Sequence, residues 1–250
     1  MEITYQIAPK EINRGISIII YGDPGRGKTT LATTLPPEET LFVITEAGLG
    51  PLIGKGHHYF DVLEAMKLNP LMPLEEIIQE FYKSLRTKHH PFKYIVVDNL
   101  TELENQLLQD YTKRRKKPFP EQKEWGDVAY RIKEWVTLFR DLQFQGITVI
   151  FNVWERQLEM KSVTGESINM SVPFVSGRNA AQICGIVDAV GHLYTKGETR
   201  MVQFSQSPTH LTKCQFQGLA REEANLMTIL NKIKEYSYAI SNQVEQVSKS

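Results

Sequence analysis

The chain has 250 residues, of which 41% are hydrophobic and 23% are charged, so it can bury one substantial core. Lys plus Arg and Asp plus Glu each number 29, and the formal net charge of zero excludes a strong overall field toward nucleic acid or a membrane. Two cysteines without metal-ligand spacing, no apolar run of membrane-spanning length and no signal-peptide pattern lead us to expect a soluble, cytoplasmic protein with free thiols and no membrane partner.

The first predicted elements surround a glycine-rich segment, GDPGRGKT, at residues 22–29. An apolar strand over 16–21 precedes it and a helix over 29–35 follows it, which is the setting of a phosphate-binding P-loop. Glycines let backbone N–H groups turn toward phosphate oxygens, and the helix N-terminus favours negative charge. Lys28 would reach the β- and γ-phosphates, and the Thr29 hydroxyl would hold Mg²⁺. The predicted ATP-binding residues are Gly22, Asp23, Pro24, Gly25, Arg26, Gly27, Lys28, Thr29 and Thr30.

Strand-like and helix-like segments then alternate along the chain. Apolar runs predict the strands, and apolar residues at helical spacing predict the helices. This alternation indicates an α/β fold with a doubly wound, mostly parallel sheet. In chain order we predict strands over 41–45 and 60–63, a helix from Pro73, a strand over 94–98, helices over 99–112 and 128–145, and a strand over 147–151.

The last third of the chain changes pattern and becomes rich in short strands. We predict a hairpin over 156–174 that turns at 164–166, a short helix over 178–184, strands over 188–195, 200–205 and 211–216, and a final helix over 221–240. The sequence therefore predicts an ATPase domain over 1–220 that ends in a β-rich extension, followed by a C-terminal helix and polar tail over 221–250.

Two carboxylates follow predicted strands. Asp98 ends the run YIVVD, and a carboxylate at the carboxyl end of such a strand can hold Mg²⁺ through water, as a Walker B aspartate does. A helix N-cap is the alternative for Asp98, because Asn99 and Thr101 follow it. Glu46 ends the strand before it along the chain and could orient or deprotonate the attacking water. A solvated loop carboxylate is the alternative for Glu46, and the residues alone leave both readings open.

Two regions carry cations that suit single-stranded DNA. Five consecutive cations stand at 113–117 in a predicted loop, with Phe119 and Trp125 nearby, and basic residues with aromatics favour a sequence-tolerant single-strand groove. The second region, 156–178, follows the strand over 147–151. A solvated charged loop is the alternative reading for each region. The candidate DNA-binding residues are Lys113, Arg114, Arg115, Lys116, Lys117, Arg156, Lys161 and Arg178.

Taken in order, the segments GDPGRGKT, FVITEAGLG, YIVVDNL and ITVIFNVWER resemble the RecA-like core. More specifically, the chain is similar to phage-encoded RecA-like ATPases with an AAA domain, some of which act in single-strand annealing and recombination. The resemblance covers about residues 14–216. It implies a RecA-like P-loop NTPase core, and it implies that Glu46 is the catalytic glutamate, because that residue ends the strand after the P-loop helix in RecA-like proteins.

The same resemblance implies further site residues. Asn152, at the end of the strand over 147–151, matches the γ-phosphate sensor, although Val153 stands where RecA has glutamine and Trp154 where phage relatives often have histidine. The segment THLTKCQF resembles one whose cations reach the neighbouring subunit's ATP. Lys213 matches its lysine and Gln215 replaces its arginine. A solvated strand lysine is the alternative for Lys213. A site completed by Lys213 would imply a homo-oligomer, either a ring or a filament.

These observations lead us to expect a Mg²⁺-dependent ATPase, stimulated by single-stranded DNA, that serves phage recombination, annealing or replication in the host cytoplasm. A single-strand-binding protein or a helicase would be a further partner. The alternative is a loader or assembly ATPase that acts on a protein such as a replicative helicase. A metabolite kinase is disfavoured because no arginine-rich lid segment is visible, a GTPase because no Asn-Lys-x-Asp motif occurs, and a scaffold without turnover stays open.

Overall fold

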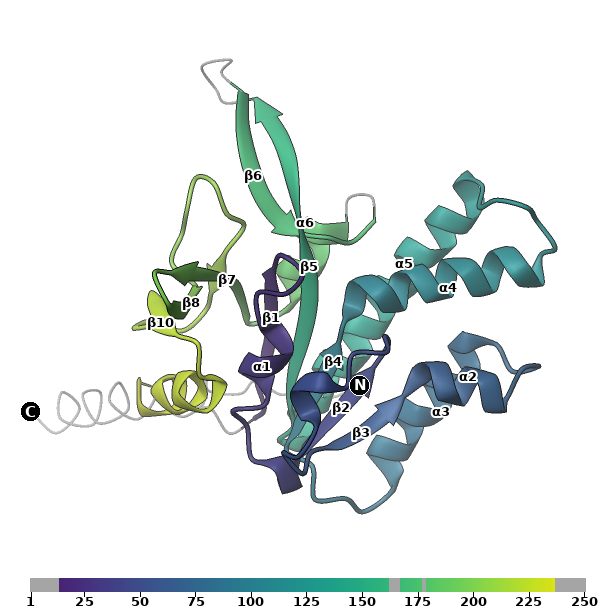
Figure 1. The fold of residues 1–250 in the computed structure, drawn as a ribbon, viewed down its shortest axis with the longest axis horizontal. Coiled ribbons are helices and arrows are strands. Elements are labelled where there is room, and N and C mark those ends of the chain that lie inside the picture. Colours follow the sequence, from purple (N-terminus) through teal and green to yellow (C-terminus); the bar gives the residue numbers. More distant parts are fainter. Residues whose placement is uncertain (1–13, 162–166, 177–178, 237–250) are drawn as a thin grey trace, which may run out of the picture.

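The computed structural model describes residues 14–161, 167–176 and 179–236. One sheet with strand order β10-β8-β7-β1-β5-β4-β2-β3 runs through the described chain (Figure 1). The parallel part consists of β1 (Ser17–Gly22), β2 (Thr40–Ile44), β3 (His58–Asp61), β4 (Tyr94–Asp98), β5 (Thr148–Lys161) and β7 (Ala189–Lys196). The antiparallel additions are β6 (Ser167–Pro173), β8 (Thr199–Gln203), β9 (Lys213–Cys214) and β10 (Arg221–Glu223). The predicted α/β fold with a mostly parallel sheet is confirmed.

Helices cover both faces of this sheet. The α-helices are α1 (Lys28–Ala32), α2 (Val62–Leu68), α3 (Leu74–Thr87), α4 (Leu100–Arg114), α5 (Gln122–Asp141) and α6 (Asn179–Ile186), and a C-terminal helix begins at residue 226. Short 3₁₀ turns occur at Pro37–Glu39, Gly50–Leu52 and Leu142–Gln145. Because side chains alternate along a strand, Ile19 of β1 packs toward α5 and α6, whereas Ile18 packs toward α1 and the C-terminal helix.

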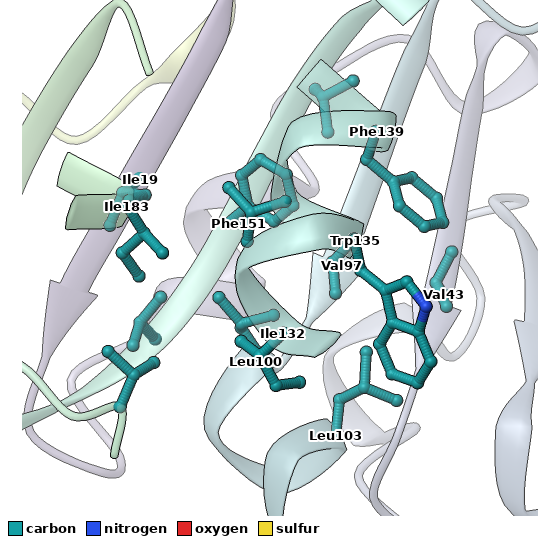
Figure 2. Packing of buried hydrophobic residues seen from close by; sticks show 14 of the residues in the cluster. Ile19, Val43, Val97, Leu100, Leu103, Ile132, Trp135, Phe139, Phe151 and Ile183 are labelled. Carbon is teal, nitrogen blue, oxygen red and sulfur yellow. The ribbon is translucent and has the colours of Figure 1, made fainter. Parts of the chain in front are cut away.

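The larger of the two apolar layers lies between the sheet and α4, α5 and α6. Figure 2 shows Trp135 and Phe139 of α5 packed over Val43, Val97 and Phe151 of the strands. These α5 residues recur at helical spacing, and a capping box between Glu121 and Glu124 starts the helix. The packing of this layer holds the strands in place, and it thereby sets the positions of the residues at their carboxyl ends.

The second layer contains the C-terminal helix. Leu226, Ile229, Leu230 and Ile233 are buried against Ile18, Ile20 and other residues of the first part of the chain. The predicted domain boundary at residue 220 lies just before β10. Glu222 of β10 pairs with Val202 of β8 in the same sheet as the rest of the chain.

Several element boundaries differ from the predictions. Helix α1 ends at Ala32 rather than at residue 35, because the Thr33 and Thr34 hydroxyls donate to carbonyls of the preceding turn and Pro36 follows. Helix α2 was not predicted. It begins where the Asp61 side chain accepts a hydrogen bond from the Glu64 N–H.

Two C-terminal elements also differ from the predictions in type or in length. Residues 221–223, predicted as helix, form β10 because they pair with β8, and only Lys213–Cys214 of the predicted strand over 211–216 pairs in the sheet. The predicted hairpin is confirmed as β5 and β6, which extend beyond the sheet as a two-stranded arm (Figure 1), and its predicted turn lies outside the described residues.

Candidate functional site

The P-loop connects β1 to α1 as predicted. Gly25 and Gly27 have φ angles of 78° and 92°, in the left-handed region where a side chain would be strained. The Lys28 Nζ donates hydrogen bonds to the carbonyl oxygens of Gly22 at 2.7 Å and Asp23 at 2.9 Å. The lysine therefore lies folded against its own loop, within the segment that would surround a phosphate.

A cleft of about 350 Å³ opens at the carboxyl edge of the parallel strands. The strand register explains why the predicted residues meet there, because Asp98 of β4 lies beside Ile44 of β2 on one side and Asn152 of β5 on the other. The residues lining the cleft are Pro24, Gly25, Gly27, Lys28, Thr29, Thr30, Glu46, Pro51, Asp98, Asn99, Trp154 and Arg200. Lys28, Thr29, Glu46 and Asp98, predicted separately from the sequence, thus share one cleft.

The remaining predicted P-loop residues lie beside the cleft rather than on its wall. Gly22 ends β1 and accepts the Lys28 hydrogen bond. Asp23 and Arg26 form an exposed ion pair at 3.3 Å with each other. Such exposed pairs contribute little to stability, so this pair shapes the outer turn of the loop without fixing it strongly.

Asp98 is buried and has two hydrogen-bond partners. Thr29 supplies one, and the Asn152 Nδ2 donates the other at 3.0 Å. Burial raises the pKa of Asp98, and these hydrogen bonds together with the nearby Lys28 oppose that rise. Asn99, not Asp98, caps α4 by accepting the Glu102 N–H at 2.7 Å. The Asp98 carboxylate is therefore not used as a helix cap.

Glu46 is oriented by the same asparagine. The Asn99 Nδ2 donates to the Glu46 Oε1 at 2.9 Å, while the Asn99 backbone N–H donates to the Thr45 hydroxyl. Burial and the Asp98 carboxylate raise the pKa of Glu46, which makes it a better base than an exposed glutamate. Asn99 thus links the start of α4 to the candidate catalytic glutamate.

The charges in the cleft fit a magnesium–nucleotide complex. Burial lowers the pKa of Lys28 to about 8 despite Asp98 and Glu46 nearby, and burial raises the pKa of both carboxylates. Charges of both signs are therefore incompletely compensated, as expected where a phosphate and a cation bind. No cluster of three or more His, Cys, Asp or Glu that could hold a metal occurs among the described residues, so Thr29 and Asp98 would share the ion with phosphate oxygens.

The predicted γ-phosphate sensor occupies a different position. Asn152 is buried behind Asp98 and does not line the cleft, and its Oδ1 has no hydrogen-bond partner within the described chain. Its contact gives it a role in holding Asp98, and the sensor role stays a prediction. Trp154, two residues further along β5, does line the cleft, and its backbone N–H donates to the Thr101 hydroxyl.

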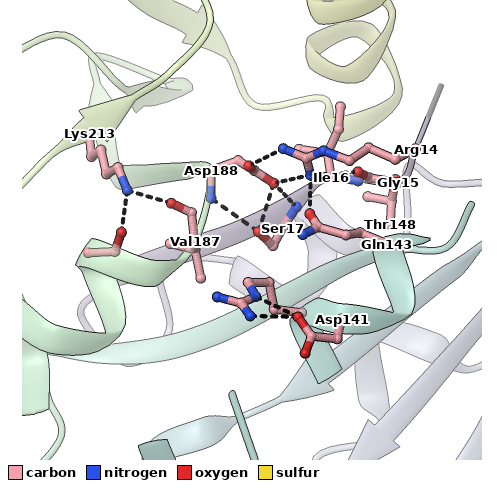
Figure 3. Close-up of polar contacts among 12 residues, drawn as sticks. Arg14, Gly15, Ile16, Ser17, Asp141, Gln143, Thr148, Val187, Asp188 and Lys213 are labelled. Carbon is pink, nitrogen blue, oxygen red and sulfur yellow. Dashed lines mark hydrogen bonds and ion pairs between the residues drawn. The ribbon is translucent and has the colours of Figure 1, made fainter. Parts of the chain in front are cut away.

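Lys213, whose polar contacts Figure 3 shows, pairs with Val190 near the start of β7, at the edge of the sheet opposite to the one that carries the cleft. Its Nζ donates to the carbonyl oxygens of Cys184, Gly185 and Val187 at 3.2, 2.7 and 2.7 Å, which caps the carboxyl end of α6. The next residue, Asp188, pairs with Arg14 and Ser17 at the start of β1. Lys213 is therefore remote from the P-loop of its own chain, and its role toward a neighbouring subunit stays a prediction.

The basic run 113–117 is partly neutralised. Lys113 and Arg114 belong to α4, which extends past the predicted end at residue 112, and α5 begins at Gln122, so the predicted loop is short. Arg114 pairs with Asp110 at 2.8 Å, Arg115 with Glu124 at 2.7 Å and with Asp127 at 2.7 Å, and Lys117 with Glu121 at 2.5 Å. Lys113 and Lys116 are exposed and make no ion pair within the described part of the chain.

The second cation region is only partly described. The Arg156 guanidinium lies 5.6 Å from the Phe174 ring centroid and is half-buried on β5. Lys161 is the last residue of β5, and Arg178 lies outside the described residues. Of the three cations in this region, only Arg156 has a described side chain.

Three residues of the cleft, Pro51, Asn99 and Arg200, were missed in the sequence. Asn99 was read only as part of the alternative cap, although its place after Asp98 could have marked it as a neighbour of Glu46. Arg200 comes from β8, and no motif surrounds it. Only the pairing of β7 with both β1 and β8 brings it to the P-loop.

The fold and the cleft define a P-loop NTPase of the α/β class, with a strand order consistent with a RecA-like core. A family model described as an AAA domain matches residues 14–216, and the chain belongs to this family. It is an AAA-type P-loop ATPase domain. No helix among residues 14–161, 167–176 and 179–236 is long and apolar enough to cross a membrane.

Comparison with solved structures gives a likeness to the flagellar accessory protein FlaH from Methanocaldococcus jannaschii. The TM-score is 0.42 at 12% sequence identity, and the match covers 77% of this chain and 80% of that chain. No functional argument follows from a likeness at this level. No curated protein matches the chain.

Proposed function

We propose that this protein binds ATP with Mg²⁺ in the cleft and hydrolyses it. The observation that carries the proposal is the meeting of Lys28, Thr29, Glu46 and Asp98 in one cleft. Lys28 and the P-loop N–H groups would bind phosphate, and Thr29 and Asp98 would hold the metal. When bound, Mg²⁺ would neutralise charge that develops on the phosphate oxygens.

Glu46 would act on the attacking water. Its raised pKa and its hydrogen bond from Asn99 support a group that accepts a proton while held in one orientation. Asn152 would hold the Asp98 carboxylate from behind through its 3.0 Å hydrogen bond. Trp154 on the cleft wall would limit the access of other water molecules.

The test is ATP hydrolysis by the purified protein, with Lys28→Ala as the variant. Lys28→Ala removes the phosphate-binding charge, so turnover should fall by at least about a hundredfold. Exposed Lys88→Ala is the control and should keep wild-type turnover, because residue 88 ends α3 outside the cleft. Unchanged turnover in Lys28→Ala would overturn the site, and circular dichroism would show whether the variant is folded.

We propose further that single-stranded DNA is the partner, in phage recombination, annealing or replication, and that a ring or filament of this chain binds it. Lys113 and Lys116 support this, because they are exposed cations close in the sequence to Phe119 and Trp125, residues that are 77% and 42% exposed. Exposed aromatics next to free cations suit stacked bases and a charged backbone. Lys213 of one subunit acting at its neighbour's cleft would belong to the same assembly.

A protein-directed loader is the second candidate, and exposed apolar side chains favour it. Leu68, the last residue of α2, and Leu71, between α2 and α3, are 73% and 91% exposed. Leu71 lies near the end of α4, where Arg114 donates to its carbonyl oxygen. Exposed apolar groups of this kind suit a protein surface such as that of a replicative helicase. Both candidates use the same end of α4.

A DNA-stimulation assay separates the two candidates. Turnover would be measured with and without single-stranded DNA at low and physiological salt, in the wild type, in Lys113→Ala/Lys116→Ala and in Lys88→Ala. On the DNA proposal the double variant binds DNA a few-fold more weakly and its salt slope falls by about two, whereas Lys88→Ala behaves as wild type. Turnover that DNA leaves unchanged would favour the loader.

A further inference from the structure

Arg200 reaches the P-loop from the far part of the chain. β7 runs parallel to β1, with His192 beside Tyr21, and continues to Lys196 past the end of β1 at Gly22. The chain then turns at Gly197, whose φ is 61°, and β8 returns antiparallel with Arg200 opposite Thr195. This hairpin therefore places Arg200 beyond the end of β1, at the level of the P-loop.

The Arg200 side chain packs against the loop itself. A Cβ atom built on Gly27 would lie 2.9 Å from the Arg200 Nε and 3.0 Å from its Cζ, so the guanidinium occupies the space that a side chain at 27 would need. Arg200 also lines the cleft together with Lys28, Thr29 and Thr30. Gly27 thus permits both the left-handed turn of the loop and the close approach of the guanidinium.

The charge of Arg200 has no partner in the protein. Within the part of the chain that the structure describes, Arg200 makes no ion pair and no side-chain hydrogen bond, whereas Arg26, the arginine of the P-loop itself, pairs with Asp23. Lys28 adds a second cation to the same cleft. A planar guanidinium with open donors beside another cation fits a phosphate group, which it can bind in a bidentate manner.

The position of β8 in the sheet defines which part of a nucleotide Arg200 would meet. β7 and β8 lie on one side of β1, whereas β5, β4 and β2, which carry the hydrolytic carboxylates or lead to them, lie on the other. Glu46 and Asp98 are therefore across the P-loop from Arg200. A cation on this side would hold the phosphate chain of a bound nucleotide and would not act on the attacking water.

We propose that Arg200 is a nucleotide-binding residue that contacts the phosphate chain of a nucleoside di- or triphosphate bound in the cleft of the same chain. This inference rests on the proposed ATP binding. It assigns to the β7–β8 hairpin a part in the site that the P-loop motif does not include. It also gives every cleft a cation besides Lys28 that needs no neighbouring subunit.

The test is equilibrium binding of fluorescent ADP and ATP analogues to Arg200→Ala, Arg200→Lys and Arg221→Ala, with steady-state turnover alongside. Arg200→Ala should bind both nucleotides about tenfold more weakly, which corresponds to about 1.4 kcal/mol, and should raise KM with little change in kcat. Arg200→Lys should be intermediate, because a lysine keeps the charge and loses the bidentate fork. Arg221→Ala on β10, outside the cleft, should match the wild type.

Lys28→Ala distinguishes the failure of this inference from the failure of the proposed function. If Arg200→Ala binds ADP and ATP as the wild type does while Lys28→Ala loses them, the role of Arg200 is overturned and the ATP site stands. A loss of kcat at unchanged affinity would also overturn the binding role. If the wild type binds neither nucleotide, both proposals fall. Arg200 is exposed, so Arg200→Ala should keep the wild-type Tm.

Discussion

The cleft at the carboxyl edge of the sheet and the basic run 113–117 are joined by one helix, α4, and differ in what faces their charges. At the start of α4 Asp98 and Lys28 are buried and Glu46 is half-buried, their charges are incompletely compensated, and their pKa values shift. At the end of α4 the cations Arg114, Arg115 and Lys117 are paired with neighbouring carboxylates. The comparison teaches that a charged motif indicates a binding site only where the fold leaves its charge unpaired.

Glu46→Gln gives the largest expected effect on the cleft. The substitution keeps the size and the contact with Asn99 but removes the proton acceptor, so turnover should fall by about 10²–10⁴-fold while ATP still binds. The measurement is single-turnover hydrolysis together with nucleotide affinity. Hydrolysis at the wild-type rate would show that another group activates water, and the role proposed for the carboxylates of the cleft would be wrong.

Glu104, in the middle of α4, has a buried carboxyl group that belongs neither to the cleft nor to the basic run 113–117. Burial raises its pKa to about 7, against hydrogen bonds from the Ser176 N–H and the charge of Arg156. The folded state therefore favours the protonated form. The resulting stability is full below the unfolded pKa of about 4.5 and is lost as the pH rises through about 7.

Glu104→Gln stays neutral at every pH and should remove this dependence. Between about pH 5 and about pH 8 the unfolding free energy of the wild type should fall relative to that of Glu104→Gln by on the order of 2 kcal/mol. Urea unfolding at a series of pH values measures it. Parallel curves for the two proteins would contradict the burial argument.

Asn99→Ser tests whether the hydrogen bond from Asn99, at the start of α4, orients Glu46 in the cleft. Serine still caps a helix, so α4 should persist, but the side chain no longer reaches Glu46. Turnover should fall about tenfold with little change in nucleotide affinity. Hydrolysis assays with circular dichroism check both parts. If turnover is retained, Glu46 is held by other contacts.

The smallest expected effect is the difference in Tm and in DNA binding between Arg115→Ala and Lys116→Ala. Arg115 lowers the pKa of the Glu124 carboxyl to about 2, so its removal should leave that carboxylate without its main partner and lower the Tm. Lys116 makes no ion pair within the described residues, and Lys116→Ala should leave the Tm unchanged and weaken DNA binding slightly. Thermal melts and a salt titration of DNA binding measure both. Equal Tm values would remove the distinction between paired and unpaired cations.

The sequence by itself predicted the P-loop, the succession of the parallel strands along the chain and the positions of Glu46 and Asp98 at the ends of strands. Local signals were sufficient there, because the glycines, the apolar runs and the residues that end them lie within a few positions of one another, and parallel strands end at one edge. Two elements with weaker patterns were missed: α2 begins at a local cap by Asp61, and β10 forms through its pairing with β8.

Only the tertiary structure decided which charges are free. Arg200 meets Gly27 through the β7–β8 hairpin, Lys213 caps α6, and the Arg115 partners lie on α5. In each case the decisive atom comes from another element, 9 and 12 residues away for Arg115, 28 residues away for Lys213 and Gly185, and on the far side of the chain for Arg200 and Gly27. Side-chain chemistry is local, whereas the neutralisation of a charge depends on what the fold places opposite it.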